Sequence, residues 1–166
     1  PGFYTWVFGY FPKPTRSDSV TGPRKTATLI NGASGEMGHE LIGRLSKKGV
    51  EDLVALDIRP IDSQIQNQCK AYINGDILDE RMLDRLQSEY EIHTVYHLAA
   101  LLSTRAEFTP VAAHRVNVEG TLRLLQLSIE QSNWHGHSVK FIFPSSIAAY
   151  GIPVRFALET TNPDMP

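Results

Sequence analysis

The stretch that decides the fold is NGASGEMG at residues 31–38, in which Gly32, Gly35 and Gly38 are spaced three residues apart. It lies between a short apolar run at 26–31 and a segment, 37–45, whose apolar side chains recur at helical spacing. Glycines between a strand and a helix let backbone N–H groups approach a pyrophosphate at the helix N-terminus, where the dipole favours anions. The pattern predicts a phosphate-binding loop, with a glycine turn that binds nothing as the alternative.

Asp57 supports the first interpretation. It lies nineteen residues after Gly38, at the end of a second predicted strand, 53–57, where a carboxylate can accept hydrogen bonds from ribose hydroxyls. A carboxylate there repels a 2′-phosphate, so the pattern favours NAD over NADP, although Arg59 softens that preference. The alternative is a capping or surface residue that follows a strand.

Strand and helix signals alternate along the rest of the chain. Further strands are expected at 70–73, 94–99 and 140–143, and helices after Asp79 and from Thr109-Pro110. Strands that alternate with helices form a parallel sheet covered on both faces. The sequence therefore predicts an α/β fold with a doubly wound parallel sheet, a Rossmann fold.

The ends of the chain differ from this pattern. Residues 1–25 combine aromatic residues with prolines and show no periodicity beyond a short candidate strand at 4–8, so they are interpreted as an arm preceding a domain at 26–166. The chain starts at Pro1 without methionine and ends in a turn-like stretch at 162–166. We expect a fragment of a longer protein.

Composition narrows the partners. The chain is 42% hydrophobic and 20% charged with a net charge of −2, which gives no sign of a nucleic-acid partner and does not by itself identify the small-molecule substrate expected below. Its longest aromatic run is too short for a membrane span. The single cysteine, Cys69, fits a reducing compartment, and we expect the cytoplasm. No metal site is expected: His93 and His97 on a strand lie about 13 Å apart, and His135 and His137 lack a third ligand.

Five motifs in order resemble the extended short-chain dehydrogenase/reductase family, which includes epimerases and dehydratases. They are the glycine loop, Gly75-Asp76-Ile77, His97-Leu98-Ala99-Ala100, VNVEGT at 116–121 and FIFPSSIAAYG at 141–151. The resemblance implies that Asp76 and Ile77 border an adenine and that 98–100 line the path of the dinucleotide. The full set of expected NAD contacts is Gly32, Ser34, Gly35, Glu36, Met37, Gly38, Asp57, Asp76, Ile77, Leu98, Ala99, Ala100 and Asn117.

The resemblance also implies a catalytic hydroxyl. In relatives the second serine of such a pair bonds the reacting oxygen, which makes Ser146 the catalytic candidate. The Tyr-x-x-x-Lys acid–base pair is absent, because Tyr150 is followed four residues later by Val154. That pair and the C-terminal substrate portion are expected beyond Pro166.

Within the family, the segments 97–103 and 144–148 resemble those of threonine-dehydrogenase-like and sugar-acid dehydrogenases more than those of typical epimerases. We expect hydride transfer between NAD and a secondary alcohol or carbonyl of a small polar substrate, with Ser103, Arg105 and Ser145 facing that substrate. Arg105 is either the partner of a substrate carboxylate or an exposed loop residue without a ligand. Such enzymes commonly form homodimers. The alternatives are a nucleotide-sugar epimerase or dehydratase and a dinucleotide-binding module without turnover.

Overall fold

The computed structural model describes residues 23–145, apart from the side chains of Ser103 and Thr104. The first half contains β1 (Lys25–Asn31), α1 (Glu36–Lys47), β2 (Leu53–Asp57), α2 (Ser63–Gln66), β3 (Ala71–Asn74) and α3 (Glu80–Glu89). The second half contains β4 (Tyr90–His97), α4 (Ser103–Phe108), α5 (Pro110–His114), the π-helical η1 (Arg115–Glu119), α6 (Gly120–His135) and β5 (Lys140–Ile142).

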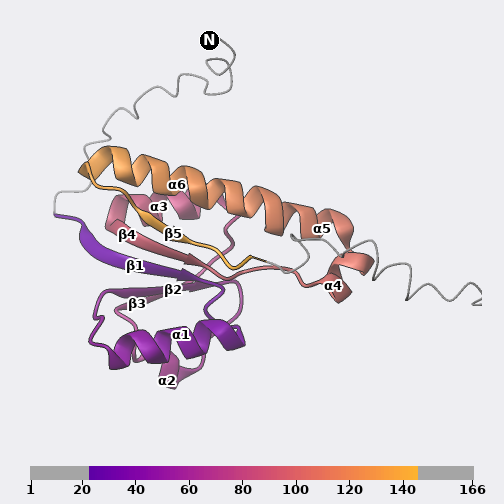
Figure 1. Cartoon of the computed structure of the whole chain (residues 1–166), viewed down its shortest axis with the longest axis horizontal. Helices are drawn as coiled ribbons and strands as arrows, with labels where there is room; N and C mark the ends of the chain where they lie inside the picture. The colour runs from indigo at the N-terminus through magenta and orange to yellow at the C-terminus, as the bar shows by residue number, and fades with distance from the viewer. Residues whose placement is uncertain (1–22, 146–166) are drawn as a thin grey trace, which may run out of the picture.

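All five strands are parallel, in the order β3-β2-β1-β4-β5. The chain moves outward from β1 to β3 and then crosses back to β4, so the strand order reverses between β1 and β4. α1 and α2 cover one face of the sheet, and α3 and α6 cover the other (Figure 1). This arrangement confirms the doubly wound fold, whose ligands bind beside the reversal point at the carboxyl ends of the strands.

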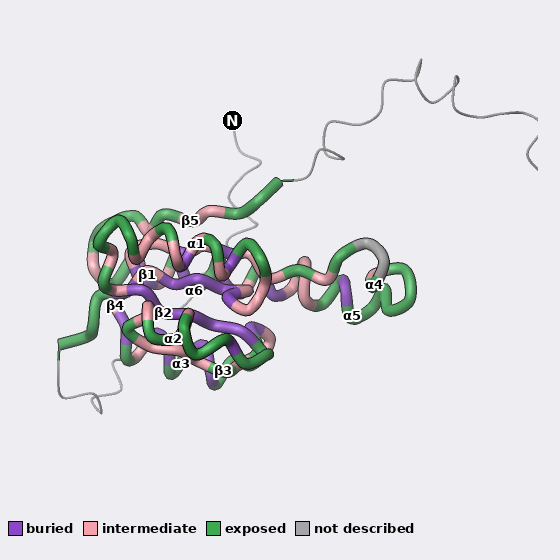
Figure 2. Tube along the Cα trace, turned by 90° about the horizontal axis from the view of Figure 1, so that it is seen from below, coloured by how far each residue is buried: buried purple, intermediate pink, exposed green. Residues whose placement is uncertain are grey.

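The core consists of two clusters, one on each face of the sheet. Leu29, Val54 and Leu124 belong to the cluster beneath α3 and α6, whereas Ile30 and Ala55 belong to the cluster against α1. Every residue of β2 is buried, as expected for a strand covered on both faces. Figure 2 shows this buried centre, together with α4 and α5 extending beyond the end of the sheet. Burial of each leucine or isoleucine side chain stabilises the folded chain by about 1.5–3 kcal/mol relative to exposure of that side chain to water.

α3 and α5 begin where the sequence predicts them. Asp79 caps α3 by accepting hydrogen bonds from the N–H groups of Arg81 and Met82, at 3.0 and 3.3 Å. Pro110 is the first residue of α5, although the Thr109 hydroxyl donates to the Arg105 carbonyl (2.9 Å) instead of capping the helix. α5, η1 and α6 follow one another without a break as far as Gly136, whose positive φ of 76° ends α6.

Two expectations need correction. The fourth strand spans 90–97 instead of 94–99, because Tyr90 and Ile92 enter the core while the polar Glu91 and His93 that alternate with them hide the start of the strand. Residues 103–108 form the short helix α4, where the sequence indicated only a rim after the strand. Within 23–145, no helix has the length and apolar character needed to span a membrane.

Candidate cofactor site

The loop after β1 is pressed against the end of β4. Gly32 has a φ of +84°, and its N–H donates to the Leu56 carbonyl at 3.0 Å. A Cβ atom on Gly32 would lie 2.5 Å from the Ala99 nitrogen, and one on Gly38 would lie 2.7 Å from the Ala33 Cα atom. Packing therefore requires glycine at both positions, which hold strand, loop and helix in close contact.

Gly35 is different. Its φ of −79° and ψ of 164° suit any residue, and a Cβ atom there would have only the Gly32 carbonyl oxygen as a neighbour, at 3.4 Å. Neither backbone strain nor packing within the described residues explains this glycine. It lies at the start of α1, which has no side-chain cap. An open backbone surface at an uncapped helix N-terminus fits the approach of a pyrophosphate.

Asp57 joins this loop to the end of β2. One carboxylate oxygen accepts from the Ser34 N–H at 2.9 Å, and the other accepts from the Arg59 N–H at 2.9 Å. The side chain is only 7% exposed, whereas Arg59, whose Nε lies 3.8 Å from the same carboxylate, is 66% exposed. The structure thus brings the predicted acidic residue into contact with the predicted loop, over an interval of 23 residues.

Ser34 offers an unused polar atom in this loop. Its Oγ is buried and has no hydrogen-bond partner among the described residues. A buried hydroxyl without a partner costs free energy, about 1–3 kcal/mol. Because the oxygen is buried, the Ser34 side chain would have to rotate before a polar ligand over the loop could give it a partner.

The segment after β4 lies across the reversal point from Gly32. The Leu98 N–H donates to the Asn31 carbonyl at 2.8 Å, and Ala99 is the residue against which Gly32 packs. Asn117 of η1 then holds Leu101 by accepting from its N–H (2.8 Å) and donating to its carbonyl (2.9 Å). Leu98 and Ala99 therefore lie beside the loop, while the Asn117 amide fixes the backbone that follows them.

Sequence reasoning missed a buried polar chain behind the loop. Asn31 Nδ2 donates to His97 Nδ1 at 2.8 Å, and His97 Nε2 lies 2.8 Å from the Thr121 hydroxyl. The Thr121 hydroxyl donates to the Asn117 carbonyl at 2.7 Å, so it accepts from His97 Nε2–H and the direction of every bond is set. The available signal was the presence of two polar residues, Asn31 and His97, at the ends of strands that are otherwise apolar.

His97 is completely buried, and Phe143 stacks on it with ring centroids 5.4 Å apart. Burial lowers its pKa from 6.5 to about 4, so the imidazole is neutral at pH 7. The neutral ring links β1, β4 and α6 through its two nitrogens. It supports the backbone of the site from behind.

The remaining expected cofactor residues are more dispersed. Glu36 and Met37 are exposed in the first turn of α1, and the Asp76 carboxylate accepts from the Leu78 N–H at 2.9 Å. Ile77 is 4% exposed and packs in the core, where it fills the space beside Gly120.

The expected substrate residues lie at the same end of the sheet. Arg105 is exposed on α4, and Ser103 is the first residue of that helix. Ser145 is exposed after β5, and Ser146 lies outside the described residues. Among the described residues, no hydrogen bond joins Arg105 to Ser145, and their part in substrate binding stays a prediction.

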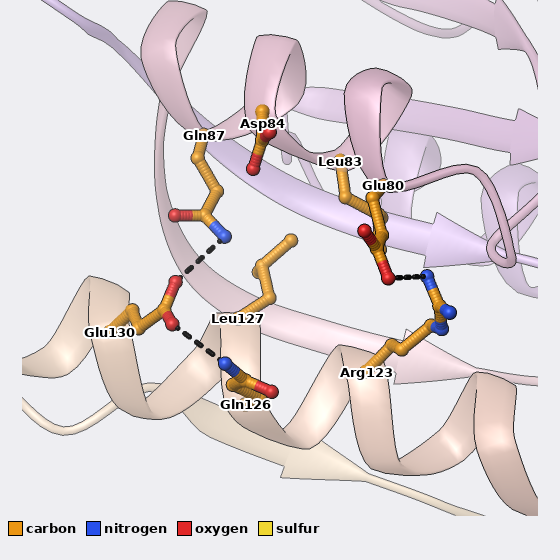
Figure 3. A pocket seen from close by; sticks show the side chains of 8 residues that line it. All are labelled: Glu80, Leu83, Asp84, Gln87, Arg123, Gln126, Leu127 and Glu130. Carbon is orange, nitrogen blue, oxygen red and sulfur yellow. Dashed lines mark hydrogen bonds and ion pairs between the residues drawn. The ribbon is translucent and has the colours of Figure 1, made fainter. Parts of the chain in front are cut away.

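A separate hollow of about 490 Å³ lies between α3 and α6 (Figure 3). Arg123 in this hollow pairs with Glu80 at 3.0 Å, and Glu130 accepts from Gln87 and Gln126, each at 3.0 Å. The first two interactions join α3 to α6, the third lies within α6, and all these groups are directed at one another. The hollow is part of helix packing and is distinct from the glycine loop.

Known proteins share this architecture. A family model described as "NAD dependent epimerase/dehydratase family" matches residues 28–165. A Staphylococcus aureus protein named as an uncharacterized epimerase/dehydratase is 32% identical over 126 residues, which cover 74% of this chain and 37% of that protein. The chain thus spans little more than a third of the length of the curated relatives it matches.

Two solved structures agree with this result. L-threonine dehydrogenase from Clostridium difficile superposes with a TM-score of 0.64 at 29% identity, covering 76% of this chain and 38% of that chain. UDP-glucose 4-epimerase from Thermotoga maritima superposes with a TM-score of 0.63 at 27% identity, covering 72% of this chain and 38% of that chain. Together with the glycine loop, Asp57 and the order of the strands, these matches show that the chain belongs to the NAD-dependent epimerase/dehydratase family.

Proposed function

We propose that this chain binds NAD and supplies the cofactor site of an NAD-dependent oxidoreductase of the extended short-chain dehydrogenase type. The observation that carries the proposal is the open backbone at Gly35 beside an uncapped helix start, with the Asp57 carboxylate 2.9 Å from the same loop. The N–H groups at the start of α1 meet the pyrophosphate, and Asp57 meets the adenosine ribose. NAD supplies the hydride chemistry when it is bound.

Asp57 also sets the preference for NAD over NADP. Its buried carboxylate has two backbone donors and stays in place beside the ribose, where it repels a 2′-phosphate. Arg59 is the only guanidinium paired with it among the described residues, and its 3.8 Å separation and high exposure leave it little able to offset that repulsion.

The reaction we propose is hydride transfer at a secondary alcohol or carbonyl of a small polar substrate. Ser146 orients the reacting oxygen, and Ser103, Arg105 and Ser145 bind the rest of the substrate. The support comes from the threonine dehydrogenase relatives. The second candidate is epimerisation or dehydration of a nucleotide sugar, which is favoured by the name of the curated relative and by the UDP-glucose 4-epimerase match.

We also propose that the chain forms a homodimer and is located in the cytoplasm. Val118, Leu122, Leu125 and Ile129 recur at helical spacing along η1 and α6, and between 37% and 60% of each side chain is exposed. An apolar stripe of this kind on a long helix fits a second copy of the chain. The lone Cys69 is free, in keeping with a reducing compartment.

Calorimetric titration with NAD and NADP tests the cofactor site. We expect the unmodified chain to bind NAD more tightly than NADP, and Asp57→Ala to weaken NAD binding about tenfold or more, because charge-assisted hydrogen bonds contribute about 1.5–3 kcal/mol each. Asp57→Asn should lose much of the preference for NAD, since its amide carries no charge to repel the 2′-phosphate.

Asp84→Ala is the matched control, because Asp84 is an exposed carboxylate on α3, away from the loop. It should bind NAD like the unmodified chain. A folded chain that binds neither dinucleotide, or that binds NAD equally well after Asp57→Ala, contradicts the proposed site.

A further inference from the structure

A cluster of metal-ligating side chains lies at the opposite end of the sheet from the glycine loop. Glu91 and His93 are in the first half of β4, and His135 is in the last turn of α6. One possible ligand atom from each of the three residues lies within 4.8 Å of the others. His93 and His135 are 42 positions apart in the sequence, so only the fold brings them together.

A β-bulge places His93 in this cluster. In the pairing of β1 with β4, Ala27 lies opposite Ile92 and Thr28 lies opposite Thr94, which leaves His93 without a partner. A bulge redirects the side chain of the extra residue, and bulges recur beside functional sites. Here the His93 ring stacks on that of His135, with centroids 5.0 Å apart.

Side chains of α6 secure the bulged backbone. The Ile92 N–H donates to Gln131 Oε1 at 3.0 Å, and the Ile92 carbonyl lies 3.3 Å from His135 Nε2. The end of α6 is therefore fixed against the start of β4. In the described part of the chain, β5 first pairs with β4 at Thr94, so β5 leaves residues 90–93 uncovered at this edge.

The geometry is close to that of a zinc site. His93 Nε2 lies 3.2 Å from Glu91 Oε1, and two ligands of a tetrahedral zinc ion are about 3.4 Å apart. The ligand atom of His135 lies within 4.8 Å of the other two, so it must move toward them by roughly 1.4 Å at most to reach that spacing. The two ring nitrogens of His135 now make long hydrogen bonds of 3.3 Å, one to the Ile92 carbonyl and one from the His137 N–H. Coordination of a metal ion replaces one of these hydrogen bonds.

The surroundings favour a cation that arrives from solvent. Glu91 and His93 are 34% and 39% exposed, which leaves their ligand atoms accessible. His135 ends a 16-residue helix, whose C-terminus carries partial negative charge. Among the residues that the structure describes, His93 is the only ion-pair partner of Glu91, so no lysine or arginine already neutralises that carboxylate.

We propose that Glu91, His93 and His135 bind a divalent transition-metal ion of the zinc class, with water completing the coordination. Two imidazoles and one carboxylate select Zn²⁺ and similar ions over Mg²⁺ and Ca²⁺, which prefer oxygen ligands. The ion fastens the end of α6 to the start of β4. The site is independent of dinucleotide binding, because β4 separates it from the glycine loop.

The test is a calorimetric titration of the tag-free 166-residue chain with Zn²⁺ at pH 7.5 in a buffer that does not bind metals. We expect one equivalent to bind with saturation. His93→Gln and Glu91→Gln should each weaken Zn²⁺ binding by about tenfold or more, because loss of even a hydrogen-bond partner of a metal ligand typically lowers metal affinity by about 10–100-fold. Titration with Co²⁺ should give visible absorption bands that both substitutions abolish.

His114→Gln is the matched control, because His114 also faces a carboxylate, that of Glu119 at 3.8 Å, but belongs to no three-residue cluster of possible metal ligands within 23–145. It should bind Zn²⁺ like the unmodified chain, and circular dichroism should show that every variant is folded. Absence of saturable binding below millimolar Zn²⁺, or equal affinity in His93→Gln and the unmodified chain, overturns the proposal.

Discussion

Alanine substitution at three glycines with different surroundings distinguishes glycines that the fold requires from a glycine that a ligand requires. Gly32 combines a positive φ with close backbone neighbours, and Gly49 has a positive φ of 81° in open space. Gly35 has an ordinary backbone, and a Cβ atom there would have a single neighbour at 3.4 Å. We expect alanine at Gly32 to cost more than about 3 kcal/mol of unfolding free energy and alanine at Gly49 to cost about 1–2 kcal/mol.

Gly35→Ala should leave stability within about 0.5 kcal/mol, yet weaken NAD binding, because its methyl group occupies the surface that the pyrophosphate approaches. Urea denaturation and calorimetric NAD titration of the same three variants measure the two effects. Unchanged NAD affinity in Gly35→Ala contradicts the role given to this glycine.

The buried His97 makes stability depend on pH. Its pKa is about 4 in the folded chain and 6.5 when unfolded, so only the unfolded state is protonated between these values. Stability is then complete above pH 6.5 and decreases as the pH falls toward 4, by about 2 kcal/mol at pH 5.

Urea denaturation at pH 7 and pH 5 measures this loss. His97→Gln removes the titrating group, and the variant should be less stable at pH 7 because Asn31 and Thr121 lose their partner. Its further loss between pH 7 and 5 should be smaller than that of the unmodified chain. Equal losses in the two proteins would show that His97 does not titrate in this range.

At the scale of elements, η1 and the segment after β4 form one unit through Asn117 and Leu101. Two hydrogen bonds, at 2.8 and 2.9 Å, join them. Asn117→Ala should cost about 1–3 kcal/mol and raise hydrogen–deuterium exchange at 98–102. Gln126→Ala, which removes an exposed bond to Glu130 on α6, should leave that exchange unchanged. Equal exchange in both variants contradicts the role of Asn117.

The elements also show what could be predicted from the sequence. Gly32 to Gly38 and Asp57 were recognised because local spacing alone fixes a strand, a turn and a helix start, and parallel strands end at one edge. The start of β4 was missed because the polar Glu91 and His93 alternate with Tyr90 and Ile92, and the bulge after them puts this alternation out of step with the rest of the strand. The pairing of His93 with His135 depends on helix docking, which spacing does not encode.

At the scale of the whole molecule, the apolar stripe on η1 and α6 predicts self-association. Leu122→Glu with Ile129→Glu places two charges on that stripe, where both residues are more than half exposed. Sedimentation should show a dimer for the unmodified chain and a monomer for the double variant, with NAD affinity retained, because the stripe is separate from the glycine loop. A monomeric unmodified chain rules out this dimer.

The cofactor site is tested most directly by an amide-resolved NMR titration of the chain with NAD. The largest shifts should fall on residues 32–38 and 57–59, with smaller ones at 98–101 and little change at Glu91 and His135, at the other end of the sheet. Shifts centred on another region, such as the hollow between α3 and α6, or no shifts from a folded chain, would contradict the account.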